Sequence, residues 1–84
     1  MNPGQTKSLI EKHIIEVFQE VFKNKGMEPP PLSSQTALDG SLGLESIDFA
    51  EVVVRLEEVF GKDPFAKGVL PHIRVLGDLA ELYE

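Results

Sequence analysis

The sequence predicts an all-α fold, and three observations lead to this prediction. Two long stretches, 9–25 and 46–60, place apolar residues at the three- and four-residue spacing of a helix face that packs on a core. A third and shorter stretch, 75–83, repeats the pattern near the C-terminus. The segments between them contain prolines and glycines, which interrupt helices. We therefore expect helices that bury their apolar faces around one core.

The first helix is expected to begin between Pro3 and Leu9 and to end at Lys25. Two start signals compete, because residues 8–11 form a capping-box pattern and a proline suits the first helical turn. Gly26 suits a left-handed cap at the other end. The expected buried stripe consists of Ile10, Ile14, Val17, Phe18, Val21 and Phe22.

Residues 27–44 are expected to form a long connection. The three prolines at 29–31 lack backbone donors and hold the chain extended. The residues that could cap a short turn are Ser33, Ser34 and Thr36. The residues that could pin the connection to the core are Leu32, Ala37, Leu38, Leu42 and Leu44. The connection brings residues 39–43 in front of the next helix, and a loop of this length is often functional or heavily tethered.

The second long helix is expected to run from close to Ser46 to Phe60, with Gly61 as its left-handed cap. Its expected inner residues are Phe49, Val52, Val53, Leu56, Val59 and Phe60. Its expected outer residues are Asp48, Glu51, Arg55 and Glu58. Ser46 falls in the first turn, where backbone N–H groups are unpaired and the helix dipole is positive. Such a position suits an attached or bound phosphate, although a serine there also serves as an ordinary cap.

The segment after Gly61 contains Pro64, Gly68 and Pro71, so at most one helical turn is expected, around residues 64–67. The apolar residues expected to fold inward beside the second helix are Phe65, Val69, Leu70 and Ile73. The last helix is expected at 75–83. Its expected inner residues are Val75, Leu76, Leu79, Leu82 and Tyr83.

Composition limits the classes of partner. The net charge is −6, and residues 32–60 hold six acidic residues against Arg55, which gives −5 for that segment. An acidic surface repels nucleic acid and attracts a cationic partner. The chain has no cysteine, no signal-like start and no stretch of about 18 apolar residues. We expect a single domain over residues 1–84 that is monomeric, cytoplasmic and without a membrane span.

The side chains offer little for catalysis. The two histidines, His13 and His72, both lie far from Ser46 in the sequence, and a chain of this size has little room for a substrate pocket. The acidic residues lack the spacing of a calcium-binding loop. We therefore expect neither an enzyme nor a metal site.

The residues around Ser46 read Gly43-Leu44-Glu45-Ser46-Ile47-Asp48, followed by Glu51 and by Leu56-Glu57-Glu58-Val59-Phe60-Gly61. This run resembles the acyl carrier protein family, whose usual core is glycine, a variable residue, aspartate, serine, and leucine or isoleucine. The segment Val75–Leu79 looks like the last helix of that family. The resemblance implies a four-helix acyl-carrier-like bundle with a long first loop and a short or degenerate third helix.

Four departures from the family pattern stand out. Position 45 is glutamate where aspartate is usual, and Arg55 interrupts a helix face that is commonly acidic or apolar. Arg74 stands where threonine or serine often caps the last helix, and residues 62–74 lack the acidic short helix of many relatives. None of the four removes the serine, and the last three concern the identity of the partners.

The resemblance implies that a phosphopantetheinyl transferase moves 4′-phosphopantetheine from coenzyme A onto Ser46. The thiol of this arm would then hold acyl groups as thioesters. The protein would present them to acyl-loading and acyl-processing enzymes of fatty-acid, lipid or polyketide-type synthesis. The residues expected to dock these partners are Glu45, Ile47, Asp48, Glu51, Val54, Arg55 and Glu58. Arg55 and the basic Lys62, Lys67 and Arg74 favour a dedicated enzyme set over the general fatty-acid pathway.

Two alternatives remain open at this point. The cargo could be an amino acid, as in peptidyl or D-alanyl carriers. Ser46 could also stay unmodified in an acidic helical module that docks a basic partner. For the carrier, we further expect an acyl chain to enter between the second helix and residues 65–73, with Phe49 and Phe65 limiting its length.

Overall fold

The computed structural model describes residues 3–64 and 73–83, with side chains from Lys7 onward. Within these ranges the chain forms α1 (Pro3–Asn24), the 3-10 helix η1 (Gly40–Leu42), α2 (Ser46–Phe60) and α3 (Leu76–Glu81). The all-α prediction is confirmed. The expected short third helix and the inward-facing Phe65, Val69 and Leu70 lie outside the described residues, apart from Pro64 at the edge.

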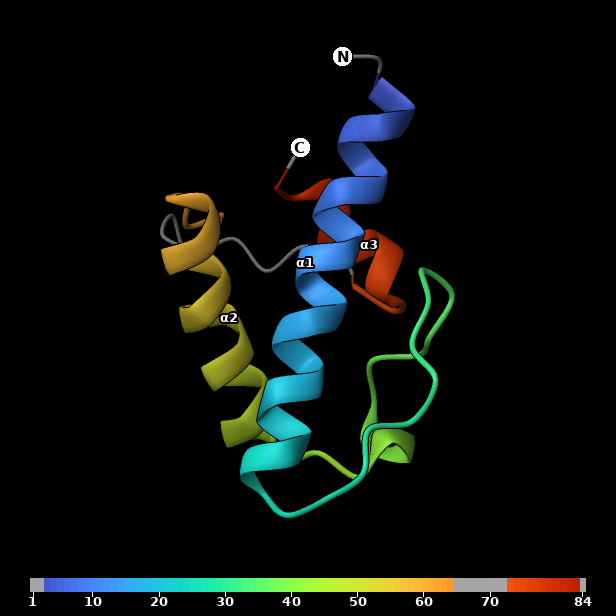
Figure 1. The fold of residues 1–84 in the computed structure, drawn as a ribbon, viewed down its shortest axis with the longest axis vertical. Coiled ribbons are helices and arrows are strands. Elements are labelled where there is room, and N and C mark those ends of the chain that lie inside the picture. The colour runs from blue at the N-terminus through green and yellow to red at the C-terminus, as the bar shows by residue number, and fades with distance from the viewer. Residues whose placement is uncertain (1–2, 65–72, 84) are drawn as a thin grey trace.

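Helix α1 forms the centre of the molecule, and α2 and α3 pack on it from two sides (Figure 1). The helix begins at the proline rather than at the capping-box pattern, which lies inside it. All six residues of its predicted stripe are buried. At its end Gly26 adopts a φ of 75°, and the Met27 amide donates to the Phe22 carbonyl at 2.9 Å. The glycine therefore closes the helix as predicted, because a positive φ strains other residues.

Helix α2 has the predicted bounds, and Gly61 ends it with a φ of 65°. Val52 and Leu56 are fully buried, while Phe49, Val53 and Phe60 are half-buried. Two predictions are wrong. Val59 is 49% exposed, because α1 and α2 diverge toward this end (Figure 1), and Asp48 is only 8% exposed although it was placed on the outer side.

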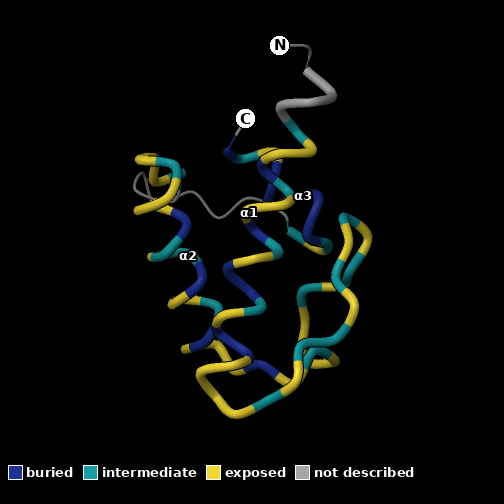
Figure 2. Tube along the Cα trace, viewed as in Figure 1, coloured by how far each residue is buried: buried dark blue, intermediate teal, exposed yellow. Residues whose placement is uncertain are grey.

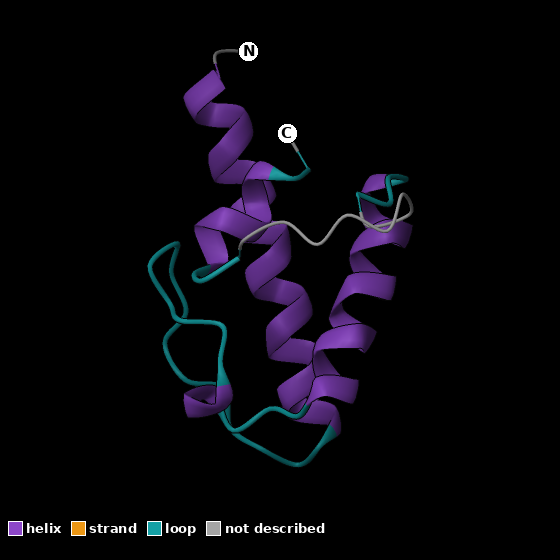
Figure 3. Ribbon diagram, turned by 180° about the vertical axis from the view of Figure 1, so that it is seen from behind, coloured by secondary structure: helices purple, strands orange, loops and turns teal. Residues whose placement is uncertain are grey.

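The long connection runs beside α3, on the side of α1 away from α2 (Figure 3). Ala37 forms an antiparallel β-bridge with Val75, and the Leu38 amide donates to the Arg74 carbonyl at 2.9 Å. Ala37 itself is exposed, so the prediction that its side chain reaches the core is wrong. It joins the connection to the last segment through its backbone instead.

The first residues of α3 also form backbone hydrogen bonds with the long connection. A helix leaves its first N–H groups without intrahelical partners. Here Leu76 donates to the Thr36 carbonyl at 3.0 Å and Gly77 donates to the Ser34 carbonyl at 2.8 Å. The polar turn predicted at residues 33–36 is present, with the Ser33 amide donating to Thr36 Oγ1 at 2.8 Å. The connection and α3 are thus joined by backbone hydrogen bonds.

Buried residues, dark blue in Figure 2, recur along α1, α2 and α3. Leu44, which precedes α2, and Tyr83, which follows α3, are also part of the core. The buried apolar residues are Ile10, Ile14, Val17, Phe18, Val21, Phe22, Leu44, Val52, Leu56, Leu76, Leu79, Ala80 and Tyr83. Burial of about 25 cal/mol per Å² of apolar surface drives this packing.

Candidate functional site

Ser46 is the first residue of α2 and is exposed. Glu45 precedes it as the N-cap residue, with an extended φ of −96° and ψ of 169°. The serine is therefore not the N-cap residue. The alternative in which Ser46 serves only as an ordinary helix cap does not apply. Its hydroxyl stands at the positive end of a helix dipole, where an attached phosphate is favoured. The position fits a phosphate ester at this oxygen.

The turn before Ser46 is shaped by Asp39 and by Gly43. The Asp39 carboxylate accepts hydrogen bonds from the hydroxyl and from the amide of Ser41, and these bonds lower the pKa of the carboxyl group. Gly43 has a φ of 81°, which a side chain would strain, and it lies close to the side chain of Met27. The chain then passes through the buried Leu44 to the helix start. Residues 39–43 lead into the helix start, as predicted.

Asp48 ties this helix start to the end of α1. Its Oδ2 atom accepts a hydrogen bond from Lys25 Nζ at 2.6 Å and another from the Glu45 amide at 2.8 Å. The hydrogen bond with Lys25, followed by that with Glu45, lowers the pKa of Asp48. The same bond to Asp48 raises the pKa of Lys25. The sequence alone does not predict this pair, because nothing local marks a partner 23 residues away.

Arg55 also joins the two long helices. Its guanidinium lies 3.3 Å from Glu20 of α1 and 3.4 Å from Glu51 of α2. The four-residue spacing on one helix face accounts for the pairing with Glu51, whereas Glu20 is 35 residues away in the sequence. Both acids belong to this chain, so Arg55 already has partners before any other protein binds.

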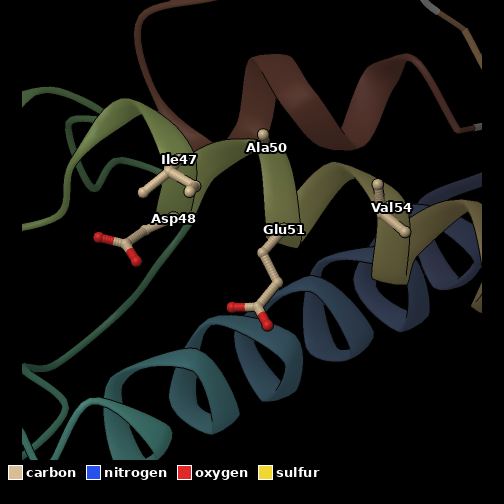
Figure 4. A pocket seen from close by; sticks show the side chains of 5 residues that line it. All are labelled: Ile47, Asp48, Ala50, Glu51 and Val54. Atoms are coloured by element: carbon tan, nitrogen blue, oxygen red, sulfur yellow. The ribbon is translucent and has the colours of Figure 1, made fainter.

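A groove of about 480 Å³ runs along the outer side of α2 and is lined by Ile47, Asp48, Ala50, Glu51 and Val54 (Figure 4). Ile47 is 72% exposed and Val54 is 55% exposed. Exposed apolar side chains of this size, next to carboxylates, are typical of a protein-binding surface. Glu45 and Glu58 are also exposed. Of the seven predicted docking residues, Asp48, Glu51 and Arg55 take part in ion pairs within the fold.

A second pocket, of about 170 Å³, reaches into the core. It is lined by Phe18, Leu38, Phe49, Val52, Val53, Ile73 and Leu79. These residues come from α1, the long connection, α2 and the last segment. The rings of Phe18 and Phe49 meet edge to face, with centroids 6.2 Å apart. The pocket is almost wholly apolar, so it suits a hydrocarbon group.

Within residues 3–64 and 73–83, no helix combines the length and the apolar composition needed to cross a lipid bilayer. In the same residues no three histidine, aspartate or glutamate side chains gather closely enough to hold a metal ion.

A family model described as "Phosphopantetheine attachment site" matches residues 12–82. The solution structure of MacpD, an acyl carrier protein from Pseudomonas fluorescens involved in mupirocin biosynthesis, is similar to this chain, with a TM-score of 0.84 and 28% sequence identity. That similarity covers 99% of this chain and 78% of MacpD. No curated protein matches the sequence.

Proposed function

The chain belongs to the acyl carrier protein family, whose attachment site holds a covalent 4′-phosphopantetheine, and we propose that Ser46 is the residue that bears this arm. The observation that carries the proposal is the exposed serine at the first residue of α2, within the run from Gly43 to Asp48. Residues 1–84 would form one carrier domain. The thiol of the attached arm supplies the thioester linkage for acyl groups.

In the attachment reaction this chain supplies only the hydroxyl group that is modified. The transferase removes the proton from the Ser46 hydroxyl, Oγ forms the new bond to phosphorus, and the nucleotide part of coenzyme A leaves. The positive end of α2 then stabilises the negative charge of the phosphodiester. The carrier presents its cargo and catalyses no step.

The outer surface of α2 is the proposed docking site for the transferase and for the acyl-loading and acyl-processing enzymes. Ile47 and Val54 provide the apolar contact, and Glu45, Glu51 and Glu58 attract basic side chains at the rim of a partner. Asp48 is withdrawn from this set because its carboxylate is buried against Lys25. Arg55 no longer argues for a dedicated enzyme set, because acids of this chain already pair with it.

The internal pocket is the proposed store for the acyl chain. A cavity of about 150 Å³ holds a benzene molecule, so the 170 Å³ found here has room for on the order of six carbon atoms. Each buried CH₂ contributes about 0.8 kcal/mol. Phe49 lines the pocket and would limit the chain length, while Phe65, the other residue expected to do so, lies outside the described residues. An acyl rather than an aminoacyl cargo suits the apolar lining.

The proposal is tested by incubating the folded protein with coenzyme A, magnesium and a promiscuous phosphopantetheinyl transferase, and measuring the intact mass. The wild type should gain the mass of the arm, and Ser46→Ala should not. Ser41→Ala is the matched control, because Ser41 is exposed in the preceding turn and should leave the gain unchanged. A folded wild type that gains no mass would instead support the unmodified interaction module.

A further inference from the structure

One carboxylate oxygen fixes the backbone on both sides of Ser46. Asp48 Oδ2 accepts the amide of Glu45, and the Asp48 amide donates in turn to the Glu45 carbonyl at 3.0 Å. These two hydrogen bonds connect residues 45 and 48 and form a ring that encloses Ser46 and Ile47. The direction in which the serine hydroxyl leaves the helix depends on this ring, because its backbone is held at both ends.

The ring is attached to the rest of the fold by Lys25. Its ammonium lies 2.6 Å from the same Oδ2 atom, with 30% of the lysine side chain and 11% of the aspartate side chain exposed. Lys25 follows the end of α1, and the amides of Gly26 and Met27 donate back into the last turn of that helix. The lysine backbone is therefore well fixed. A charge-assisted hydrogen bond of this length is among the stronger polar contacts in proteins.

We propose that Lys25 is a positioning residue for the attachment reaction: its ammonium holds Asp48 in place, and Asp48 holds the turn that presents Ser46 Oγ. The inference rests on the proposed role of Ser46 and adds a residue from another helix to it. Without the ammonium, Asp48 is a nearly buried carboxylate beside the acidic Glu45. Removing one partner of such a pair leaves a charge uncompensated, so the side chain reorients toward water and the ring opens.

The test compares Lys25→Met with Lys23→Met, which removes the same charge from the same end of α1 at an exposed position. Transfer of the arm from coenzyme A is measured as kcat and as KM for the carrier. Lys25→Met should lower kcat about tenfold, since small misplacements of a reacting atom reduce rates steeply, and should change KM less than about twofold. Lys23→Met should leave kcat within about twofold, and Lys25→Arg, which keeps the ion pair, should restore most of it.

A second measurement does not depend on the transferase. Hydrogen exchange of the Glu45 amide should be faster by about tenfold in Lys25→Met, and unchanged in Lys23→Met, when both proteins are folded. If Lys25→Met does not fold, Asp48→Asn provides the same test, because it keeps an oxygen for Glu45 and loses the charge that holds Lys25. For Asp48→Asn, kcat should again fall with little change in KM.

Three results would overturn the inference: an unchanged kcat in the folded Lys25→Met protein, a change confined to KM, or an equal loss in Lys23→Met. A change confined to KM would make Lys25 a part of the docking surface. A wild type that accepts no arm would refute the proposed function instead. The two failures can therefore be told apart.

Discussion

Tyr83 shows how strongly the fold can change a single residue. It is the only tyrosine in the sequence, it is 6% exposed, and its ring lies 5.1 Å from that of Phe60. Its hydroxyl oxygen is buried and has no hydrogen-bond partner among the described residues. Burial, followed by the charges of Asp63 and Glu57, raises the pKa of Tyr83 to about 12. The sequence pattern predicted a buried position for this residue, which is confirmed, but the predicted helix at 75–83 is shorter in the structure and ends at Glu81, so Tyr83 follows it.

Titration of Tyr83 is therefore a direct probe of the core. The ultraviolet absorbance of tyrosinate should appear near pH 12 in the folded protein and near the ordinary pKa of 10.0 in denaturant. Because the folded pKa is raised, the associated stability is fully present below pH 10 and is lost as the pH rises toward 12. A folded protein that titrates near pH 10 would show that the ring is not buried.

At the scale of elements, α2 and α3 begin in the same way. In α2, Asp48 accepts the amide of Glu45, and in α3, Asp78 accepts the amides of Arg74 and Val75 at 3.0 and 3.1 Å. An aspartate in the third helical position thus satisfies the N–H groups that precede each helix, and its charge suits the helix dipole. The N-cap residue of α3 is Val75, so Arg74 does not stand at the capping position as the sequence comparison suggested, and Asp78 accepts the amides of both residues.

The bounds of α1 and α2 were predictable because their signals are local. Apolar spacing marks the buried face of each, and Gly26 and Gly61 mark their ends. The pairings between helices were not predictable from one sequence. Lys25 and Asp48 are 23 positions apart, and Arg55 and Glu20 are 35 apart, so neither spacing carries a periodic signal.

Gly77 is predicted to be required for the contact between α3 and the long connection. A Cβ atom there would lie 3.1 Å from the Ser34 carbonyl oxygen, which also accepts the Gly77 amide. Gly77→Ala should lower the free energy of unfolding by about 1 kcal/mol, because the strain of overpacking exceeds the gain in helix propensity. Gly40→Ala is the control, since its Cβ meets nothing within 4 Å. Denaturant unfolding measures both, and equal stability of the two variants would contradict the prediction.

Arg55→Glu tests the second link between α1 and α2. The change places three carboxylates together, with Glu20 and Glu51, and should lower the free energy of unfolding by about 1 kcal/mol. In about 1 M salt most of this loss should disappear, because the groups are partly exposed. Lys12→Glu, an equal charge change on the exposed side of α1, should have a smaller effect. A loss that does not depend on salt would argue against an electrostatic origin.

For the whole molecule, the arrangement separates two surfaces that serve one proposed role. Helix α2 turns its outer side to a groove and its inner side to a pocket, and Ser46 stands at its first residue. The α3 end of the chain is joined to the long connection, and α2 is joined to α1 by ion pairs. The sequence pattern predicted the positions of the helices and identified Ser46 as the candidate attachment residue. The volume of the pocket depends on how the elements meet, which no local pattern encodes.

The pocket predicts how stability depends on the cargo. In the acylated protein, the free energy of unfolding should rise by about 0.8 kcal/mol per carbon until the pocket is filled, at roughly six carbons, and should then level off. Phe49→Ala should move this plateau to longer chains, because it removes a ring from the lining. Val54→Ala, on the outer groove of the same helix, should leave the plateau in place. Stability that does not vary with chain length would exclude internal storage.

Tandem mass spectrometry of the modified protein tests most directly whether the hydroxyl oxygen of Ser46 bears the arm. Fragmentation of the peptide that contains residues 41–46 separates the exposed hydroxyls of Ser41 and Ser46. We predict that the phosphopantetheine mass is found on the fragments that include Ser46 and on none that lack it. Finding it on Ser41, or on any other residue, would contradict the account.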